Sequence, residues 1–179
     1  YVDRIKQLVH IEEDGSFRLD MRNFTFDYGL RMYNKRFEEV MGEPTRPLET
    51  GLLTQFHKDV ARSLQVVVDE VMVKLARHVV RETSCPRLCL AGGVALNCVA
   101  NGEVLRAGDV EDIYVQPNAG DGGGAMGAAL WAWHDLLDKP RGWKLDTSFL
   151  GPGYDETQIE QVLTRYRAEY HRLERQQLL

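Results

Sequence analysis

The chain has 179 residues, enough for one compact domain or two small ones, and 44% of them are hydrophobic, as is usual for a soluble globular protein. Its formal net charge of −5 gives no sign of a nucleic-acid-binding role, and no apolar run approaches the roughly 20 residues that a membrane-spanning helix needs. The sequence begins within a helical pattern without a methionine, and we expect no signal peptide. We therefore expect a domain of a longer cytoplasmic polypeptide, with its three cysteines buried and reduced.

The first fifty residues predict a series of short elements. Apolar residues at helical spacing indicate a helix end over residues 1–9, and Asp14-Gly15 is typical of a hairpin turn. Alternating apolar residues predict strands at 17–19 and again at 24–28, where every second residue is aromatic. A short helix is expected over 30–41.

A long helix is predicted over residues 52–83, ended by Pro86. Its apolar residues recur at steps of three and four, which indicates one face packed on a core. They are Leu53, Phe56, Val60, Leu64, Val67, Val71, Leu75 and Val79. His57 lies beside this stripe and is interpreted as a surface or pocket-edge residue. Further along, residues 138–153 predict a loop, and a last helix is expected from Asp155, with Gln158 as its capping-box partner.

Between these helices, a strand, a glycine turn and a helix occur twice in succession. Residues 88–91 predict a buried parallel strand, followed by Gly92-Gly93 and a helix. Residues 112–116 predict a second strand, followed by a glycine-rich loop over 120–124 and a helix of small residues. Glycine at such turns lets a phosphate or sugar approach the backbone and the N–H groups of a helix end.

In the first turn, Gly92 and Gly93 are candidates for binding a phosphate or nucleotide. Asn97, one turn into the expected helix, would offer a sugar hydroxyl both a donor and an acceptor. The turn is equally well explained as a tight connection, with Asn97 in solvent, and the sequence alone leaves both interpretations open.

In the second turn, Asp121 lies within a cluster of four glycines, Gly120, Gly122, Gly123 and Gly124. An aspartate at this place could simply cap the helix. That role does not explain the glycines, which cost stability unless a close approach requires them. A lone carboxylate would also repel a phosphate, so Asp121 is predicted to bind a divalent cation.

Two nucleotide motifs fit less well. Gly120-x-Gly122-x-x-Ala125 matches the dinucleotide fingerprint, but no further strand bearing an acid follows at the expected spacing. A phosphate-binding P-loop is excluded, because the chain has no Gly-Lys-Ser/Thr sequence.

Four segments closely resemble the bacterial O-carbamoyltransferases of the nodulation and antibiotic-tailoring type. They are residues 57–65 (HKDVARSLQ), 90–97 (LAGGVALN), 116–125 (QPNAGDGGGA) and 149–154 (FLGPGY), spread over nearly the whole chain. These enzymes are similar in fold to the actin/hexokinase ATPases and to the universal tRNA threonylcarbamoyl-adenosine transferase.

The resemblance implies an α/β fold with two parts. Residues 1–150 would form the second lobe of an actin/hexokinase-like (ribonuclease H-like) ATPase domain, and residues 151–179 would begin a carboxy-terminal domain or linker helix. ATP, as a carbamoyl-adenylate, and a divalent metal, iron in the wider group, would be the cofactors. The residues that would bind the nucleotide are Gly92, Gly93, Asn97, Gly120, Gly122 and Gly123, and Asp121 would hold the metal.

The implied reaction moves a carbamoyl group from carbamoyl phosphate, through the adenylate, to a hydroxyl of a small-molecule or saccharide acceptor. The first lobe, with the remaining metal ligands, and the carboxy-terminal domain would belong to the same polypeptide. This chain alone would then be inactive, and none of its residues is assigned as catalytic. The full-length protein could form a homodimer. The alternatives are a lobe of a sugar or acetate kinase, and a non-catalytic nucleotide-binding module.

Overall fold

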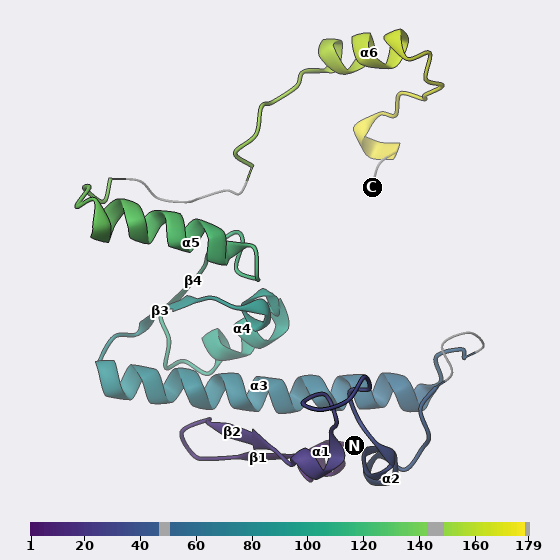
Figure 1. Cartoon of the computed structure of the whole chain (residues 1–179), viewed down its shortest axis with the longest axis vertical. Helices are drawn as coiled ribbons and strands as arrows, with labels where there is room; N and C mark the ends of the chain where they lie inside the picture. The colour runs from purple at the N-terminus through teal and green to yellow at the C-terminus, as the bar shows by residue number, and fades with distance from the viewer. Residues whose placement is uncertain (47–50, 143–148, 178–179) are drawn as a thin grey trace. The chain divides into compact units, whose positions relative to one another are not determined.

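The computed structural model describes residues 1–46, 51–142 and 149–177. The chain divides into two compact units, Tyr1–Leu145 and Asp146–Leu179, and each is described by itself. In the first unit, helices are combined with two small sheets, which confirms a mixed α/β class (Figure 1).

The chain begins with a short helix and a β-hairpin. Helix α1 (Val2–Ile5) is followed by β1 (Val9–Ile11) and β2 (Phe17–Leu19), which pair antiparallel. The predicted turn is confirmed: Gly15 has a φ of 87° and donates its N–H to the Glu12 carbonyl at 3.1 Å. The helix predicted to residue 9 is wrong beyond α1, because Val9 pairs in the hairpin instead.

The strand predicted over residues 24–28 is also wrong. A 3-10 turn, η1 (Met21–Asn23), leads into a looped segment in which only Phe24 forms a bridge, to Tyr33. The aromatic residues there pack as a cluster rather than alternate across a sheet, since Phe24 contacts both Phe26 and Phe37 with ring centroids 5.9 Å apart. Helix α2 (Lys35–Met41) begins later than predicted, after an Asn34 cap.

The long helix α3 (Gln55–Thr83) matches the prediction closely. His57 has a structural role that the sequence did not reveal: the Thr54 N–H donates to its Nδ1 at 3.1 Å, as one arm of a capping box. At the other end, Ser84 adopts the left-handed conformation, two residues before Pro86.

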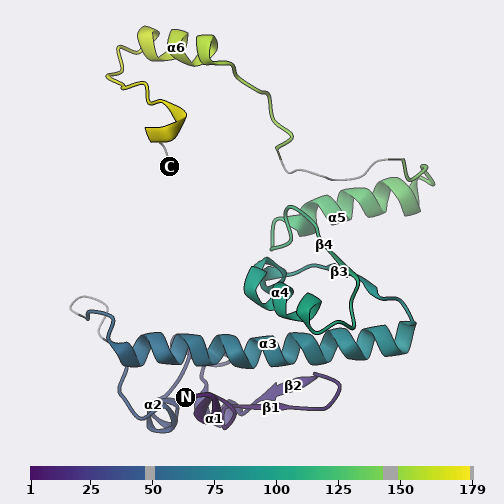
Figure 2. The same cartoon turned by 180° about the vertical axis from the view of Figure 1, so that it is seen from behind.

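Two faces of α3 are covered, not the single face that the apolar stripe predicted. Figures 1 and 2 show the hairpin, α1 and α2 on one side of α3, and β3, β4 and α4 on the other. The first cluster is built on Ile5, Leu8, Met41 and Val67, and the second on Ala76, Val104 and Val110. Three residues of the predicted stripe remain exposed: Leu53 by 64%, Leu64 by 52% and Val79 by 40%.

Both predicted strand–turn–helix units are present, but the first strand is not buried as predicted, because its residues alternate between exposed and half-buried. Strands β3 (Arg87–Leu90) and β4 (Asp112–Val115) pair in parallel, with Leu88 opposite Ile113. Their crossover holds a 3-10 turn, η2 (Gly93–Leu96), and helix α4 (Cys98–Arg106). After β4 comes α5 (Gly123–Trp131), which continues as a π-helical turn, η3 (Ala132–Leu136).

The second unit contains α6 (Glu156–Arg165) and a 3-10 turn, η4 (Arg175–Gln177). The predicted capping box is confirmed, because Asp155 accepts the Gln158 N–H at 2.8 Å and donates its own N–H to Gln158 Oε1 at 2.9 Å. Residues 143–148 of the predicted loop lie outside the described residues.

The cysteines depart from expectation. Cys85, Cys89 and Cys98 are free thiols, as predicted, but all three are exposed rather than buried. Cys89 alternates with Leu88 and Leu90 along β3, so it lies on the face of the strand turned away from the second cluster. Among the described residues, no helix has the length and apolar character needed to cross a bilayer.

Candidate functional site

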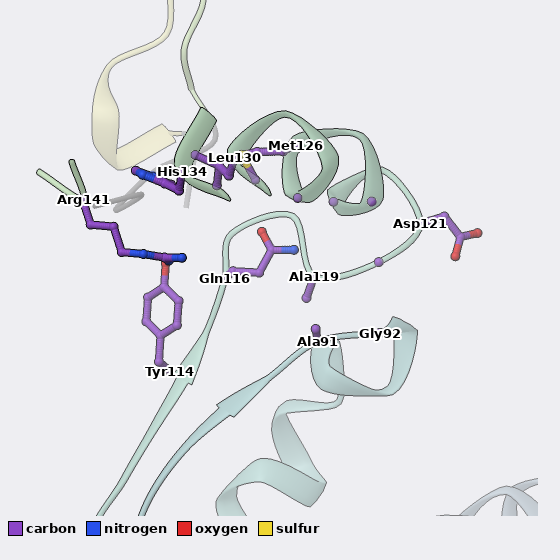
Figure 3. Close-up of a pocket in the computed structure, with 14 residues that line it drawn as sticks. Ala91, Gly92, Tyr114, Gln116, Ala119, Asp121, Met126, Leu130, His134 and Arg141 are labelled. Atoms are coloured by element: carbon purple, nitrogen blue, oxygen red, sulfur yellow. The ribbon is translucent and has the colours of Figure 1, made fainter. Parts of the chain in front are cut away.

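The two glycine turns lie side by side at the carboxyl ends of the parallel strands. The Gly92 N–H donates to the Ala119 carbonyl at 2.7 Å, and Ala119 is only 3% exposed. Figure 3 shows both residues where the chain leaves β3 and β4. Ligands of open α/β sheets bind at this edge, so the structure brings the predicted residues of both turns to a suitable place.

The first turn has room for a ligand. Gly92 has a φ of 97°, which favours glycine whatever surrounds it. Gly93 has no such constraint, and a Cβ added there would meet no described atom within 4 Å. Packing within the fold therefore does not explain why residue 93 is glycine. A ligand that lies close to the backbone at this position would explain it.

Asn97 caps α4, and most of its hydrogen-bonding capacity is already used. Its Oδ1 accepts the Ala100 N–H at 3.1 Å and Gln65 Nε2 at 3.2 Å, and its Nδ2 donates to Gln65 Oε1 at 3.1 Å. An amide oxygen has two lone pairs, so the acceptor expected for a sugar hydroxyl is occupied. The Gln65 contact was missed, although Gln65 ends one of the segments that carry the resemblance.

Another asparagine supports the same turn. Asn101 Nδ2 donates to the carbonyl of Ala95 in η2 at 2.8 Å. Its Oδ1 is buried and has no hydrogen-bond partner among the described residues. The Asn101 side chain of α4 thus holds the carbonyl of Ala95 within the turn between Gly92 and Asn97.

Asp121 does not cap helix α5, so the simplest alternative explanation of this residue is wrong. Gly122 occupies the cap position, and no side-chain bond is made there. The Asp121 carbonyl accepts the Gly124 N–H at 3.2 Å, while its carboxylate is exposed. In Figure 3 the carboxylate points outward from the loop, away from Gln116 and Met126.

Two glycines of this loop have packing reasons of their own. A Cβ on Gly123 would overlap the Asn118 carbonyl and Gln116 Nε2, and one on Gly122 would press on the Asn118 side chain. Gln116 fixes that carbonyl, since its Nε2 donates to it and its Oε1 accepts the Asn118 N–H at 3.0 Å. Gly124, by contrast, has open space, so packing explains only part of the glycine cluster.

A pocket of about 790 Å³ opens between the two turns, β4 and α5. Its wall combines small and apolar residues, such as Ala91 and Met126, with the polar side chains of Tyr114, Gln116 and His134. Gly120, Asp121 and Gly123 of the second turn also line the pocket. Figure 3 shows Asp121 at the outer side of this loop. This volume is in the range of small-molecule and cofactor sites.

The carboxylate of Asp121 could supply one ligand to the predicted metal. No three side chains of His, Cys, Asp or Glu gather into a metal site within the described ranges. The exposed carboxylate of Asp121 would need ligands from elsewhere, and its role as a metal ligand stays a prediction.

Residues 2–130 match a family model described as the carbamoyltransferase N-terminus. The match covers α1 through α5, apart from the last residue of α5, and includes both glycine turns.

Several proteins are similar to the chain. An uncharacterized protein of Synechocystis is 46% identical over 168 residues, which are 91% of this chain and 27% of that protein. The nodulation protein NolNO of Sinorhizobium fredii is 38% identical over 75% of this chain and 20% of its own length. The nodulation protein NolO of Bradyrhizobium diazoefficiens is 40% identical, with 75% and 25% covered. The chain thus spans between a fifth and about a quarter of the length of these relatives.

Proposed function

The chain belongs to the family of carbamoyltransferase amino-terminal domains, and from this premise we propose that it is part of an O-carbamoyltransferase. The proposed reaction takes a carbamoyl group from carbamoyl phosphate, through carbamoyl-adenylate, to a hydroxyl of a small-molecule or saccharide acceptor. The observation that supports a site in this chain is the direct bond between its two glycine turns, Gly92 to Ala119.

The nucleotide is proposed to bind along these turns. Gly92 and Gly93 would lie against its phosphate or sugar, because the Gly93 backbone is open to approach. Gly120, Gly122 and Gly123 would line the opposite edge of the nucleotide site. Of these three, Gly120 and Gly123 also line the pocket beside α5. Asn97 would contribute a donor, since its oxygen is occupied by Ala100 and Gln65.

Asp121 is proposed to supply one carboxylate ligand to a divalent metal, with iron as the first candidate. A metal at this place would act as a Lewis acid on the carbamoyl carbonyl. The outward direction of the carboxylate in Figure 3 is compatible with ligands from another part of the protein.

The group transfer would form one bond and break another. The acceptor hydroxyl oxygen attacks the carbamoyl carbon, the bond from that carbon to the phosphate oxygen of the adenylate breaks, and AMP leaves with the electron pair. The hydroxyl proton passes to a base for which no residue of this chain is proposed. Holding the nucleotide at two bonded turns fixes the leaving group in place.

The remaining parts of the enzyme are proposed from the same family relation. We take residues 1–150 as the second lobe of an actin/hexokinase-like ATPase domain and residues 151–179 as the start of the next domain or a linker. The first lobe and a carboxy-terminal domain would complete a cleft that excludes water from the reactive adenylate.

The decisive experiment is product analysis with the full-length protein. With carbamoyl phosphate, ATP and a hydroxyl acceptor, a carbamoyltransferase releases AMP and a carbamoylated acceptor. A sugar or acetate kinase would release ADP instead, and a non-catalytic nucleotide-binding module would bind ATP without turnover. Either of those results would reject the proposal, which the family relation favours over both alternatives.

A further inference from the structure

Behind the first glycine turn, a pair of side-chain amides joins α3 to the start of α4. Gln65 Nε2 donates to Asn97 Oδ1 at 3.2 Å, and Asn97 Nδ2 donates to Gln65 Oε1 at 3.1 Å. Both residues are half-buried. Two antiparallel bonds between planar groups restrict both side chains, so the rotamer of Asn97 depends on that of Gln65.

The direction of this pair is set by a carboxylate. Asp69, one helical turn after Gln65, accepts a second bond from Gln65 Nε2 at 2.7 Å. The Asp69 side chain is 14% exposed. An ionised carboxylate can only accept hydrogen bonds, so the nitrogen of Gln65 must face Asp69, and its oxygen is left to face Asn97 Nδ2.

Asn97 passes this orientation on to the helix end. Its Oδ1 also accepts the N–H of Ala100, a residue with 0% exposure, so water cannot replace the bond. A reversed Asn97 amide would set two donors against each other and leave the buried N–H of Ala100 without an acceptor. With Oδ1 filled twice and one N–H given to Gln65, Asn97 retains a single N–H for any ligand.

We propose that Gln65 is a positioning residue for the nucleotide site. It acts through Asn97, which it fixes so that the remaining N–H donates to an oxygen acceptor of the nucleotide, while the cap of α4 stays intact. The inference rests on the proposed function, because it takes a nucleotide as the ligand of this turn.

The chain itself offers a matched control for Gln65. Gln55 donates to Asp59 Oδ1 at 2.7 Å on the same helix, with the same spacing, but makes no bond to the glycine turn. Gln65→Met and Gln55→Met therefore remove the same kind of bond along α3, and only the first also removes the pair with Asn97. If Gln65→Met does not fold, Gln65→Glu keeps the shape and still cannot donate to Asp69 or Asn97.

The measurements are the Kd for ATP, the melting temperature and the hydrogen-exchange rate of the Ala100 amide, all in the full-length protein. For Gln65→Met we expect ATP binding weakened about fivefold to tenfold and Ala100 exchange accelerated by a similar factor, the effect of about one hydrogen bond. Gln55→Met should leave both at wild-type values. A merely structural role would lower the melting temperature without changing ATP affinity.

Each result has a definite meaning. Unchanged ATP affinity in Gln65→Met, while Gly93→Val loses binding, would overturn the positioning role and leave the proposed site standing. ATP binding that survives Gly93→Val unchanged would overturn the site itself, and this inference with it. Equal Ala100 exchange in Gln65→Met and Gln55→Met would overturn the claim that Gln65 fixes Asn97.

Discussion

The N–H of Gly92 donates to the carbonyl oxygen of Ala119 at 2.7 Å, so the turn after β3 and the loop after β4 are bonded through their backbones. Side-chain substitutions in either turn remove neither of these two backbone groups. The effect of a substitution that meets no neighbouring atom, such as Gly93→Val, can therefore be assigned to the space at the substituted residue.

Gly93→Val should impair nucleotide binding while the protein stays folded. The new side chain meets no described atom near its Cβ, so the melting temperature should change little, but it would occupy the space proposed for the ligand. We expect ATP affinity to fall at least about tenfold, which corresponds to about 1.4 kcal/mol. Isothermal titration of the full-length protein measures this. Gly153→Val, at another glycine with open surroundings, is the control and should bind normally.

Gly123→Ala and Gly124→Ala should have opposite effects on stability. Alanine at 123 would overlap the backbone carbonyl of Asn118, and we expect a loss of about 1–3 kcal/mol in the free energy of unfolding. Alanine at 124 has open space within α5, where it should stabilise the helix by roughly 0.5–1 kcal/mol. Denaturant unfolding of both variants decides this, and equal effects would show that the loop conformation described for Asn118 is wrong.

Asp121→Asn should remove metal without unfolding the protein. The Asp121 side chain does not cap α5, so stability should be unchanged, whereas a lost carboxylate ligand would lower metal content and transfer activity together. The measurement is iron per protein in the full-length enzyme. Asp155→Asn provides the control, because Asp155 is a true cap, and asparagine caps about as well. Equal iron content in wild type and Asp121→Asn would reject the ligand role.

The ion pair between Lys6 and Glu70 should make stability depend on pH. Lys6 Nζ lies 2.7 Å from Glu70 Oε2 and, mainly by this hydrogen bond, lowers the pKa of Glu70 below its ordinary 4.5. A lowered pKa in the folded state means that the stabilisation is present above the unfolded value and is lost as pH falls through the folded value.

Glu70→Gln should therefore destabilise the protein at neutral pH and not at acid pH. Because both partners are partly exposed, we expect less than about 1 kcal/mol near pH 7. The difference from wild type should disappear as the pH drops below 4.5 towards the lowered pKa. Urea unfolding at several pH values tests this, with Glu13→Gln, an exposed carboxylate of the hairpin turn, as the control. If Glu70→Gln remained less stable than wild type at low pH, the loss would come from altered packing and not from the ion pair.

Local signals in the sequence predicted most of the elements. Asp14-Gly15 specified a hairpin turn, Pro86 marked the end of α3, and Asp155 with Gln158 formed the expected cap. These features depend on neighbours in the chain, and so they can be read without knowing the fold. Both glycine turns were found for the same reason.

Features set by distant contacts were not predictable in this way. The alternation of Phe24, Phe26 and Tyr28 was interpreted as a strand, but Phe24 packs on Phe37 of α2, more than ten residues away. The pairing of Gln65 with Asn97 spans 32 residues. Periodicity gave one apolar face of α3. The second face, made of Met72, Val73, Ala76 and Val80, is also apolar, but only its contacts with distant residues such as Val104 identify it as a separate face.

The position of α3 between two apolar clusters has a consequence for how the first unit unfolds. The pair β3–β4 is too small a sheet to persist alone, and a hairpin such as β1–β2 is marginal in water. Each draws its stability from the same 29-residue helix. If the elements on one side of α3 open, the helix loses packing contacts that also support the cluster on its other side. The two clusters should therefore unfold in one cooperative event. We expect the backbone amides in the middle of α3 to exchange last.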